Sequence, residues 1–176
     1  INPDIIIAIV VLYKTPFKDS LSVKSLLASM SAALWSKLDM VVYDNSPEYN
    51  VGVIWDEFHF TVDYLPDYTN SGVSKAYNIA CKIGKERGKK YLLLLDQDTI
   101  ISDSYCSDLL SLDEDYSLIV PKLVHNNVII SPCKYILGRA SSLEQNECSR
   151  GIKSIKRRNF LNSGSLISIG LFDKVG

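Results

Sequence analysis

The sequence lacks any apolar run long enough to cross a lipid bilayer. Its longest such run lies at residues 5–13, whereas a membrane-spanning helix needs roughly 20 residues. No basic segment precedes this run and no small-residue cleavage site follows it, so we do not expect a signal peptide. We expect no transmembrane segment in this chain, and we interpret the run as a buried strand.

An excess of charge of either sign is also absent. The 19 Lys and Arg residues nearly balance the 20 Asp and Glu residues, and the formal net charge is −1. This balance argues against a general binder of nucleic acids or of membrane surfaces. With only 9 Gly and 6 Pro among 176 residues, the composition excludes collagen-like and low-complexity proteins. The length predicts a single domain over residues 1–176.

Cysteine is scarce, and its occurrences are isolated. No C-x-x-C pair occurs, and no histidine lies near a cysteine at the spacing of zinc ligands. A disulfide framework would be sparse for this length. We therefore expect the cysteines to be small, buried hydrophobic side chains. A reducing, cytoplasmic setting fits best, either free in the cytoplasm or at the inner face of the membrane. The four cysteines are Cys81, Cys106, Cys133 and Cys148.

Up to residue 100, apolar runs typical of strands alternate with segments of helical periodicity. Such alternation is typical of an α/β domain with right-handed crossovers, so we predict a three-layer sandwich with a mostly parallel central sheet. Asp19 or Ser20 can cap the first helix. The predicted order is strand 5–13, helix 19–35, strand 38–43, strand 58–65, helix 73–87 and strand 91–95. Apolar positions at helical spacing are Leu21, Leu26, Leu27, Met30, Ala33 and Leu34, then Val73, Ala76, Tyr77, Ala80 and Ile83.

After residue 100 the pattern is less regular. The acidic residues between 103 and 115 predict a solvated helix and loop. Residues 118–121 and 127–130 predict short strands that could pair antiparallel. The basic segment 150–158 is interpreted as a solvated loop, and the alternative is contact with a phosphate-rich acceptor.

Polar side chains follow all four predicted strands. Tyr13 and Lys14 follow the first, Asp44 and Asn45 the second, Pro66-Asp67 the third, and the Asp96-Gln97-Asp98 segment the fourth. Ligands of open α/β sheets bind beyond the carboxyl ends of the strands. An aromatic ring and several carboxylates there suggest a ligand with a flat base, hydroxyls and a diphosphate held through a divalent metal ion, Mg²⁺ or Mn²⁺.

Each of these features also has a purely structural interpretation. Asp96 and Asp98 lie on one side of an extended chain after four leucines, but paired aspartates also form turns. Asp44 suits a β-turn, and Tyr13 suits packing. Their joint position at successive strand ends favours a ligand site.

The segment before the second predicted helix has the same two interpretations. Asn70-Ser71-Gly72 suits a loop and a helix cap. The amides at a helix N-terminus also form an anion site, to which Lys75 would add positive charge.

Several blocks of the sequence resemble, in order, inverting GT-A glycosyltransferases of family 2, nearest to their rhamnosyltransferase-like branch. The blocks are residues 10–13, residues 42–46, Asn70-x-Gly72 with Ala76-x-Asn78-x-Ala80, residues 93–98, and residues 162–168 followed by 172–176. The resemblance implies a GT-A, Rossmann-like fold and a role in polysaccharide biosynthesis. It also implies transfer of a sugar from a UDP- or dTDP-linked donor to a hydroxyl of a saccharide or lipid-linked acceptor.

The resemblance also implies roles for individual residues. Asp44 would accept a hydrogen bond from the imide N–H of uracil or thymine, and Tyr13 would lie against that base. Asp96 would contact the ribose or the metal, and Asp98 would bind the metal that holds the diphosphate and stabilises its developing charge. Gln97, Asn70, Gly72 and Lys75 would lie near the donor.

One functional group of the family has no match in this sequence. Inverting transfer needs a carboxylate general base, which in the family follows the block that ends here at Gly176. Asp173 belongs to an earlier block and is a poor candidate. We therefore expect residues 1–100 to form the donor half of the site and residues 101–176 to begin the acceptor half. Such a chain would bind a nucleotide sugar better than it transfers one.

Two other functions compete with this interpretation. In a haloacid-dehalogenase-like phosphatase, Asp96 would be the nucleophile and Asp98 the acid/base. However, that motif normally ends the first strand of its domain, and no later metal motif occurs here. A non-catalytic nucleotide-binding module is the second alternative. A nicotinamide dehydrogenase is disfavoured because no G-x-G-x-x-G follows the first strand.

Overall fold

The central sheet is mostly parallel, as predicted. The computed structural model describes residues 1–31, 37–48, 60–113, 116–136, 139–143, 151 and 158–175. The sheet has the strand order β3-β2-β1-β4-β11-β5, in which β1 to β4 are parallel and β11 is antiparallel to both of its neighbours. The strands are β1 Ile6–Leu12, β2 Asp39–Asp44, β3 Thr61–Pro66, β4 Tyr91–Asp96, β5 Leu118–Ile119 and β11 Leu166–Ser168.

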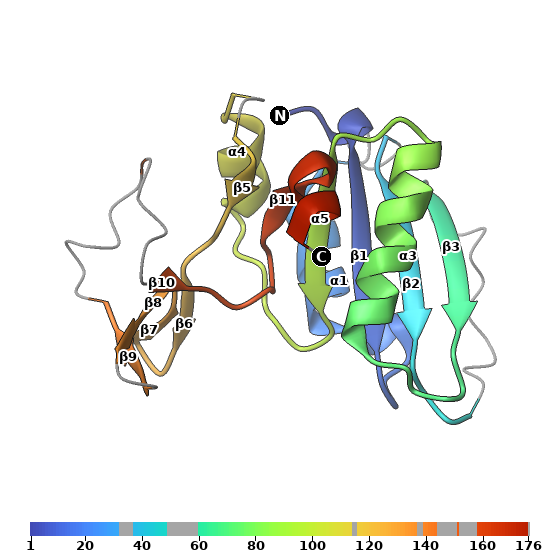
Figure 1. Cartoon of the computed structure of the whole chain (residues 1–176), viewed down its shortest axis with the longest axis horizontal. Helices are drawn as coiled ribbons and strands as arrows, with labels where there is room; N and C mark the ends of the chain where they lie inside the picture. The colour runs from blue at the N-terminus through green and yellow to red at the C-terminus, as the bar shows by residue number, and fades with distance from the viewer. Residues whose placement is uncertain are drawn as a thin grey trace.

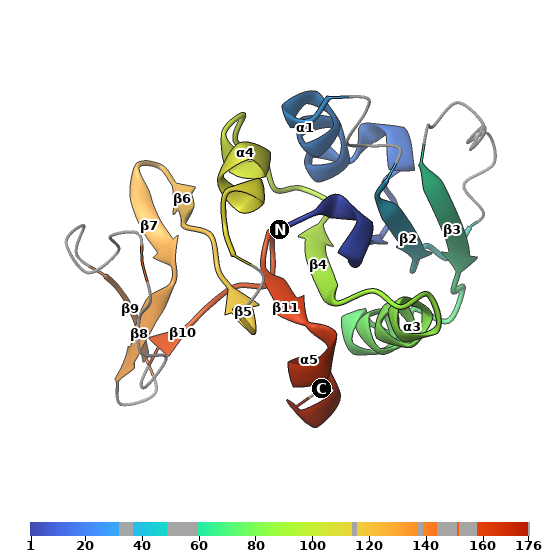
Figure 2. The same ribbon diagram turned by 90° about the horizontal axis from the view of Figure 1, so that it is seen from above.

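Helices cover both faces of this sheet (Figure 1 and Figure 2). Helices α1 (Leu21–Ser29) and α4 (Tyr105–Leu110) pack on one face, and α3 (Val73–Glu86) and α5 (Ile169–Val175) pack on the other. Short 3-10 helices at Pro3–Ile5 and Phe17–Asp19 flank β1. The predicted three-layer sandwich is therefore confirmed.

Strand β1 is buried along its whole length. Ala8 and Val10 pack on the side of α1, whereas Ile7 and Ile9 pack on the side of α3. Because successive side chains of a strand point to opposite faces, a strand covered on both sides needs the continuous apolar run that the sequence provides.

Helix α1 differs in part from its prediction. Ser20 caps it as expected, since the Ser20 hydroxyl accepts a hydrogen bond from the amide of Val23 (3.4 Å). The helix ends at Ser29, earlier than predicted, and residues 32–36 lie outside the described part of the chain. Leu21 is 44% exposed, so its assignment to the buried face is wrong, because the first helical residue lies at the margin of the sheet.

Helix α3 begins at Val73 and is followed by Gly88 at φ 68°, as its C-terminal glycine predicted. The predicted stripe is buried at Ala76, Tyr77 and Ala80. Val73 is exposed, so its assignment to the stripe is wrong, because the helix begins beyond the ends of the strands.

Outside the central sheet, two small sheets follow β5 in the chain (Figure 1). One is the hairpin of β6 (Leu123–His125) and β7 (Val128–Ser131); the other joins β10 (Arg158–Asn159), β8 (Cys133–Ile136) and β9 (Arg139–Ser142). The predicted strands at 118–121 and 127–130 exist as β5 and β7, and both pair antiparallel, β5 with β11 and β7 with β6. Asn126 and Asn127 both have positive φ and form a tight turn, which pairs β7 with β6.

No helix among the described residues is long and apolar enough to span a membrane. Cys81 and Cys106 are free and buried, as predicted, and Cys133 is free and half-buried. Cys148 lies outside the described residues. The acidic segment does contain a helix, α4, which buries Cys106 and Leu109.

Candidate functional site

The predicted site residues gather at one edge of the sheet, the carboxyl edge, where the parallel strands β1 to β4 end. In the strand register, Leu12 lies opposite Asp44, and Val11 lies opposite Asp96. Tyr13 directly follows Leu12 in the chain, and Asp98 lies two positions after Asp96. The structure therefore brings together the residues that the sequence placed at successive strand ends.

Asp44 is almost fully buried at the end of β2. One of its carboxylate oxygens accepts a hydrogen bond from the Ser46 amide (2.9 Å), and the other accepts one from the Tyr64 hydroxyl (2.7 Å). Asp44 therefore forms the turn that was the structural alternative to a ligand role. The two roles are compatible, because a carboxylate oxygen accepts more than one hydrogen bond.

The turn after β2 is joined to the end of β1. The Asn45 amide donates to the Leu12 carbonyl (2.8 Å), and the Lys14 amide donates to the Ser46 hydroxyl (2.8 Å). The Oδ1 of Asn45 is buried and has no hydrogen-bond partner among the described residues. Buried polar groups usually have a partner, so this oxygen is an unsatisfied acceptor near the carboxyl edge.

Gln97 has a role that the sequence did not reveal. Its side-chain oxygen accepts a hydrogen bond from the Tyr13 amide (2.8 Å), and its carbonyl accepts from the Leu21 amide (2.8 Å) and the Ser20 hydroxyl (3.0 Å). Gln97 thus ties the end of β4 to the end of β1 and the start of α1. The Tyr13 ring is 44% exposed, with the Lys14 ammonium 5.1 Å from its centre.

Asp96 and Asp98 are the acidic pair of this edge. Asp96 is half-buried and Asp98 is exposed. Burial raises the pKa of Asp96, the nearby charge of Asp98 raises it further, and Ser163 lowers it. No basic side chain among the described residues forms an ion pair with either carboxylate.

This pair fits a divalent cation of the Mg²⁺ or Mn²⁺ type. Such ions prefer oxygen ligands and bind through one or two carboxylates together with phosphate oxygens. The described part of the chain has no group of three or more His, Cys, Asp or Glu that could hold a metal by itself. A cation between Asp96 and Asp98 would therefore need oxygens from a ligand, and it would relieve the repulsion between the two carboxylates.

The loop between β3 and α3 is organised by Asp67, which is buried. Its carboxylate accepts hydrogen bonds from the Thr69 amide (3.1 Å) and hydroxyl (2.5 Å), and from the Tyr43 hydroxyl (2.7 Å). The Ser71 amide donates to it as well (3.2 Å). These donors, Thr69 first, hold the pKa of Asp67 well below its ordinary value. The loop is therefore fixed by a buried anion.

Asn70, Gly72 and Lys75 lie on or just after this loop. Asn70 has φ 51° and Gly72 has φ 85°, and the latter conformation strongly favours glycine. No side chain caps the start of α3. Lys75 reaches back to Asp67 (3.5 Å), so part of the positive charge predicted for the anion site is already neutralised.

The 162–165 turn packs against the end of β4. The Gly164 amide donates to the Leu94 carbonyl (2.8 Å), and the Ser163 hydroxyl donates to Thr99 (2.6 Å) while accepting from the Asp96 amide (3.3 Å). A Cβ on Gly164, which has φ 73°, would lie 3.1 Å from Pro121. Sequence analysis did not place Ser163 beside Asp96, and only the resemblance of residues 162–168 to a family block pointed there.

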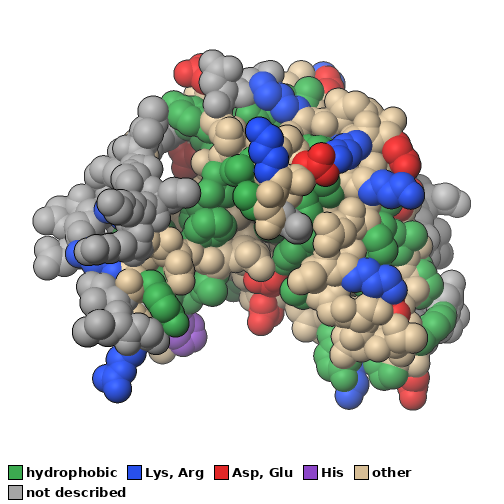
Figure 3. Space-filling model, viewed as in Figure 1, with side chains coloured by type: hydrophobic (Ala, Val, Ile, Leu, Met, Phe, Trp, Pro, Cys, Tyr) green, Lys and Arg blue, Asp and Glu red, His purple; other side chains and the backbone are tan. Residues whose placement is uncertain are grey.

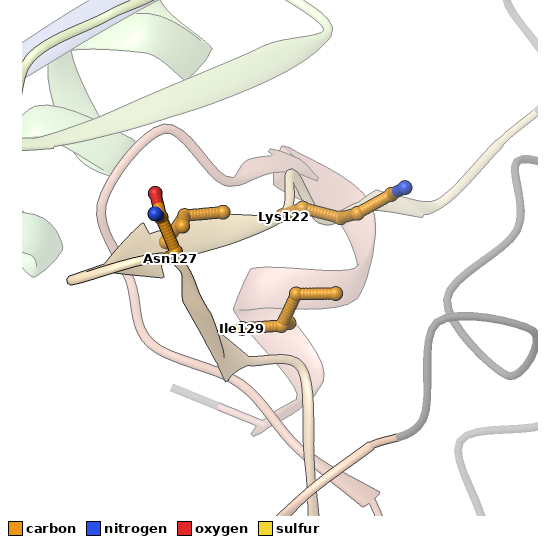
Figure 4. Close-up of a pocket in the computed structure, with 4 residues that line it drawn as sticks. Lys122, Asn127 and Ile129 are labelled. Atoms are coloured by element: carbon orange, nitrogen blue, oxygen red, sulfur yellow. The ribbon is translucent and has the colours of Figure 1, made fainter.

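A depression formed by the β6–β7 hairpin and the residue before it lies away from this edge. Lys122, Val124, Asn127 and Ile129 line this shallow depression, which has no carboxylates (Figure 4). Most of the basic segment 150–158 lies outside the described residues, and Arg158 belongs to β10.

Comparison with known proteins agrees with the observed fold. The family model described as Glycosyl transferase family 2 matches residues 9–165. The crystal structure of S. aureus TarS 1-349 is similar, with a TM-score of 0.59 and 16% sequence identity. The match covers 96% of this chain and 48% of that one, so the chain spans about half the length of that structure. No curated protein matches the sequence.

Proposed function

Because this chain belongs to glycosyl transferase family 2 and has the GT-A fold, we propose that its carboxyl edge binds a nucleotide diphospho-sugar. The proposed donor is UDP- or dTDP-linked. The proposed acceptor is a hydroxyl of a saccharide or of a lipid-linked molecule, and the transfer inverts the configuration of the sugar. The family match sets aside the phosphatase and dehydrogenase alternatives.

The observation that carries this proposal is the Asp96–Asp98 pair at the end of the parallel strand β4, where no basic side chain of the described residues forms an ion pair with it. Asp98, with Asp96, would hold Mg²⁺ or Mn²⁺ against the diphosphate. When bound, the cation supplies stabilisation of the negative charge that develops on the departing nucleotide diphosphate. The free thiols of Cys81 and Cys106 support a reducing, cytoplasmic setting.

The residues around the pair would bind the rest of the donor. The exposed ring of Tyr13 would lie against the base, in a position that Gln97 fixes through the Tyr13 amide. Asp44, oriented by Ser46 and Tyr64, would accept a hydrogen bond from the imide N–H. Asn70, Gly72 and the start of α3 would lie near the phosphates.

The general base is not assigned to any described residue. Inverting transfer needs a carboxylate that removes the proton of the acceptor hydroxyl. Asp173 forms an ion pair with Lys85 in the last turn of α3, at the opposite edge of the sheet. Its position therefore does not suit this role.

Calorimetric titration with UDP, dTDP and CDP in the presence of Mn²⁺ tests this function. UDP and dTDP should bind, whereas CDP, which lacks the imide N–H, should bind weakly. Asp44→Ala should weaken UDP binding by about 1.5–3 kcal/mol, the range for a hydrogen bond to a charged group. Tyr64→Phe is the matched control, because it removes a partner of Asp44 but keeps the carboxylate, so it should retain the preference for UDP over CDP.

Each result has a distinct meaning for the proposal. Equal affinity for UDP and CDP would remove the base-reading role from Asp44. Absence of binding by all three nucleotides would overturn the donor site as a whole. Release of UDP from a UDP-sugar would overturn the non-catalytic nucleotide-binding module, whereas binding alone is expected of either function.

A further inference from the structure

Tyr77 of α3 carries a buried hydroxyl that has no role in the donor site as proposed. Its side chain is 6% exposed, and its hydroxyl proton has no acceptor among the described residues. The ring packs in the same cluster as Val11 and Leu94, close to the ends of β1 and β4. Because Val11 lies opposite Asp96 in the strand register, this packing brings Tyr77 beneath the acidic pair.

Two polar groups lie close to this hydroxyl. The charge of Asp96 raises the pKa of Tyr77, and the Asn162 side chain, as a hydrogen-bond donor toward the phenol oxygen, lowers it. Burial is the larger influence and raises the pKa of Tyr77 to about 12. A tyrosine hydroxyl can both accept and donate a hydrogen bond, so its proton is free for a second partner.

Burying a hydroxyl whose proton has no acceptor is unfavourable for folding. A phenylalanine would fill the same apolar space without burying an unsatisfied polar group. Unsatisfied buried groups are few in native proteins, and a binding role is one of the explanations for them. Carboxylates that bind metal ions are commonly oriented by hydrogen bonds from neighbouring groups.

We propose that Tyr77 is a positioning residue of the donor site, whose hydroxyl donates a hydrogen bond to the Asp96 carboxylate when the cation and the nucleotide diphosphate bind. This inference rests on the proposed donor site and assigns a new residue to it. Tyr77 belongs to α3 and packs beneath the carboxyl edge, whereas the ligand would approach Asp96 from solvent. Asp96 would thereby be held in one orientation.

The variant Tyr77→Phe tests this role, with Mn²⁺-dependent UDP binding and the free energy of unfolding as readouts. UDP affinity in the presence of Mn²⁺ should fall by about tenfold, the lower end of the range for losing such an orienting group. The free energy of unfolding should stay the same or rise. The control Tyr43→Phe removes a hydroxyl that does have a partner, Asp67, so it should lower the free energy of unfolding.

A double-mutant cycle with Asp96→Asn shows whether Tyr77 acts through Asp96. The titration uses UDP concentrations that still saturate the Asp96→Asn protein. We expect Tyr77→Phe to have no further effect in that background. Additive losses would overturn the proposal, because they would mean that the hydroxyl contacts the ligand directly.

The remaining outcomes separate this proposal from the donor site itself. Unchanged UDP affinity in Tyr77→Phe would overturn the role of Tyr77 and leave the donor site standing. Failure of the native protein to bind UDP with Mn²⁺ would overturn both.

Discussion

The carboxylates at the two edges of the central sheet have different partners. At the amino edge, where the parallel strands begin, Asp39 pairs with Arg87 and Lys89 (both 3.3 Å), and Asp63 pairs with Arg87 (2.7 Å). Figure 3 shows basic and acidic side chains side by side toward this end of the molecule, the upper end in that view. The acids of the amino edge are therefore neutralised within the chain.

At the carboxyl edge the acids fall into two kinds. Asp67 and Asp44 are buried and accept hydrogen bonds from hydroxyls and amides. Asp96 and Asp98 are close enough for their negative charges to repel, and neither has a basic partner in the described part of the chain. The buried acids shape the loops, whereas the unneutralised pair is available to an external cation.

This contrast separates stability from binding. Changes at the amino edge and at Asp67 should alter the free energy of unfolding, and changes at Asp98 should alter ligand binding. Substitutions of Tyr43, Asp39 and Asp67 test whether these residues act on stability alone.

The largest effect on stability is expected from Tyr43→Phe. The Tyr43 hydroxyl donates to the buried Asp67 carboxylate, and a hydrogen bond to a charged group contributes about 1.5–3 kcal/mol. Urea denaturation should show a loss in that range. An unchanged free energy of unfolding would mean that Asp67 does not stabilise the loop before α3.

A smaller loss is expected from Asp39→Asn at the amino edge. Asp39 and Lys89 are mostly buried, with side chains 16% and 10% exposed, so their pairing should contribute about 1 kcal/mol, the upper end of the range for surface pairs. Asp19→Asn is the matched control, because the Asp19–Lys24 pair is more than half exposed and should contribute little. Equal losses in the two variants would contradict the account of the amino edge.

The most gradual effect is the dependence of stability on acid. The pKa of Asp67 is lower in the folded protein than its ordinary value of 3.8. Its contribution is therefore fully present above pH 3.8 and is lost as the pH falls below that value. Thermal unfolding between about pH 2 and 6 should show a shallower loss at low pH in Asp67→Asn than in the native protein. Parallel curves would show that Asp67 is not the carboxylate responsible.

The fold was predictable where the sequence signal is local. β1 and β4 are continuous apolar runs, and α3 has a clear stripe that ends at a glycine. β11 could not be predicted, because three residues gain their strand conformation from pairing with β4, which lies more than 70 positions earlier. The same is true of the small sheets apart from β7, which the apolar residues at 127–130 did predict; their strands have two to four residues.

The sequence predicted where the candidate site lies, but not the side-chain hydrogen bonds that join its residues. Strand ends located Asp44 and Asp96 at one edge, because parallel strands carry their ends to the same place. The side-chain partners depend on distant segments, so the contact of Asp44 with Tyr64 and that of Tyr13 with Gln97 left no trace in local sequence. Tyr77 was assigned to the apolar stripe, although its hydroxyl distinguishes it from the other buried members.

The central claim is that the carboxyl edge holds a divalent cation together with a nucleotide diphosphate. It is tested most directly by the Mn²⁺-dependent increase in melting temperature that UDP causes, compared between native protein, Asp98→Asn and Asp39→Asn. Asp98→Asn should lose the Mn²⁺-dependent part of the increase while keeping its stability without ligand, since an exposed carboxylate supports no core. Asp39→Asn should be less stable but keep the full increase. An undiminished Mn²⁺-dependent increase in Asp98→Asn would contradict the claim.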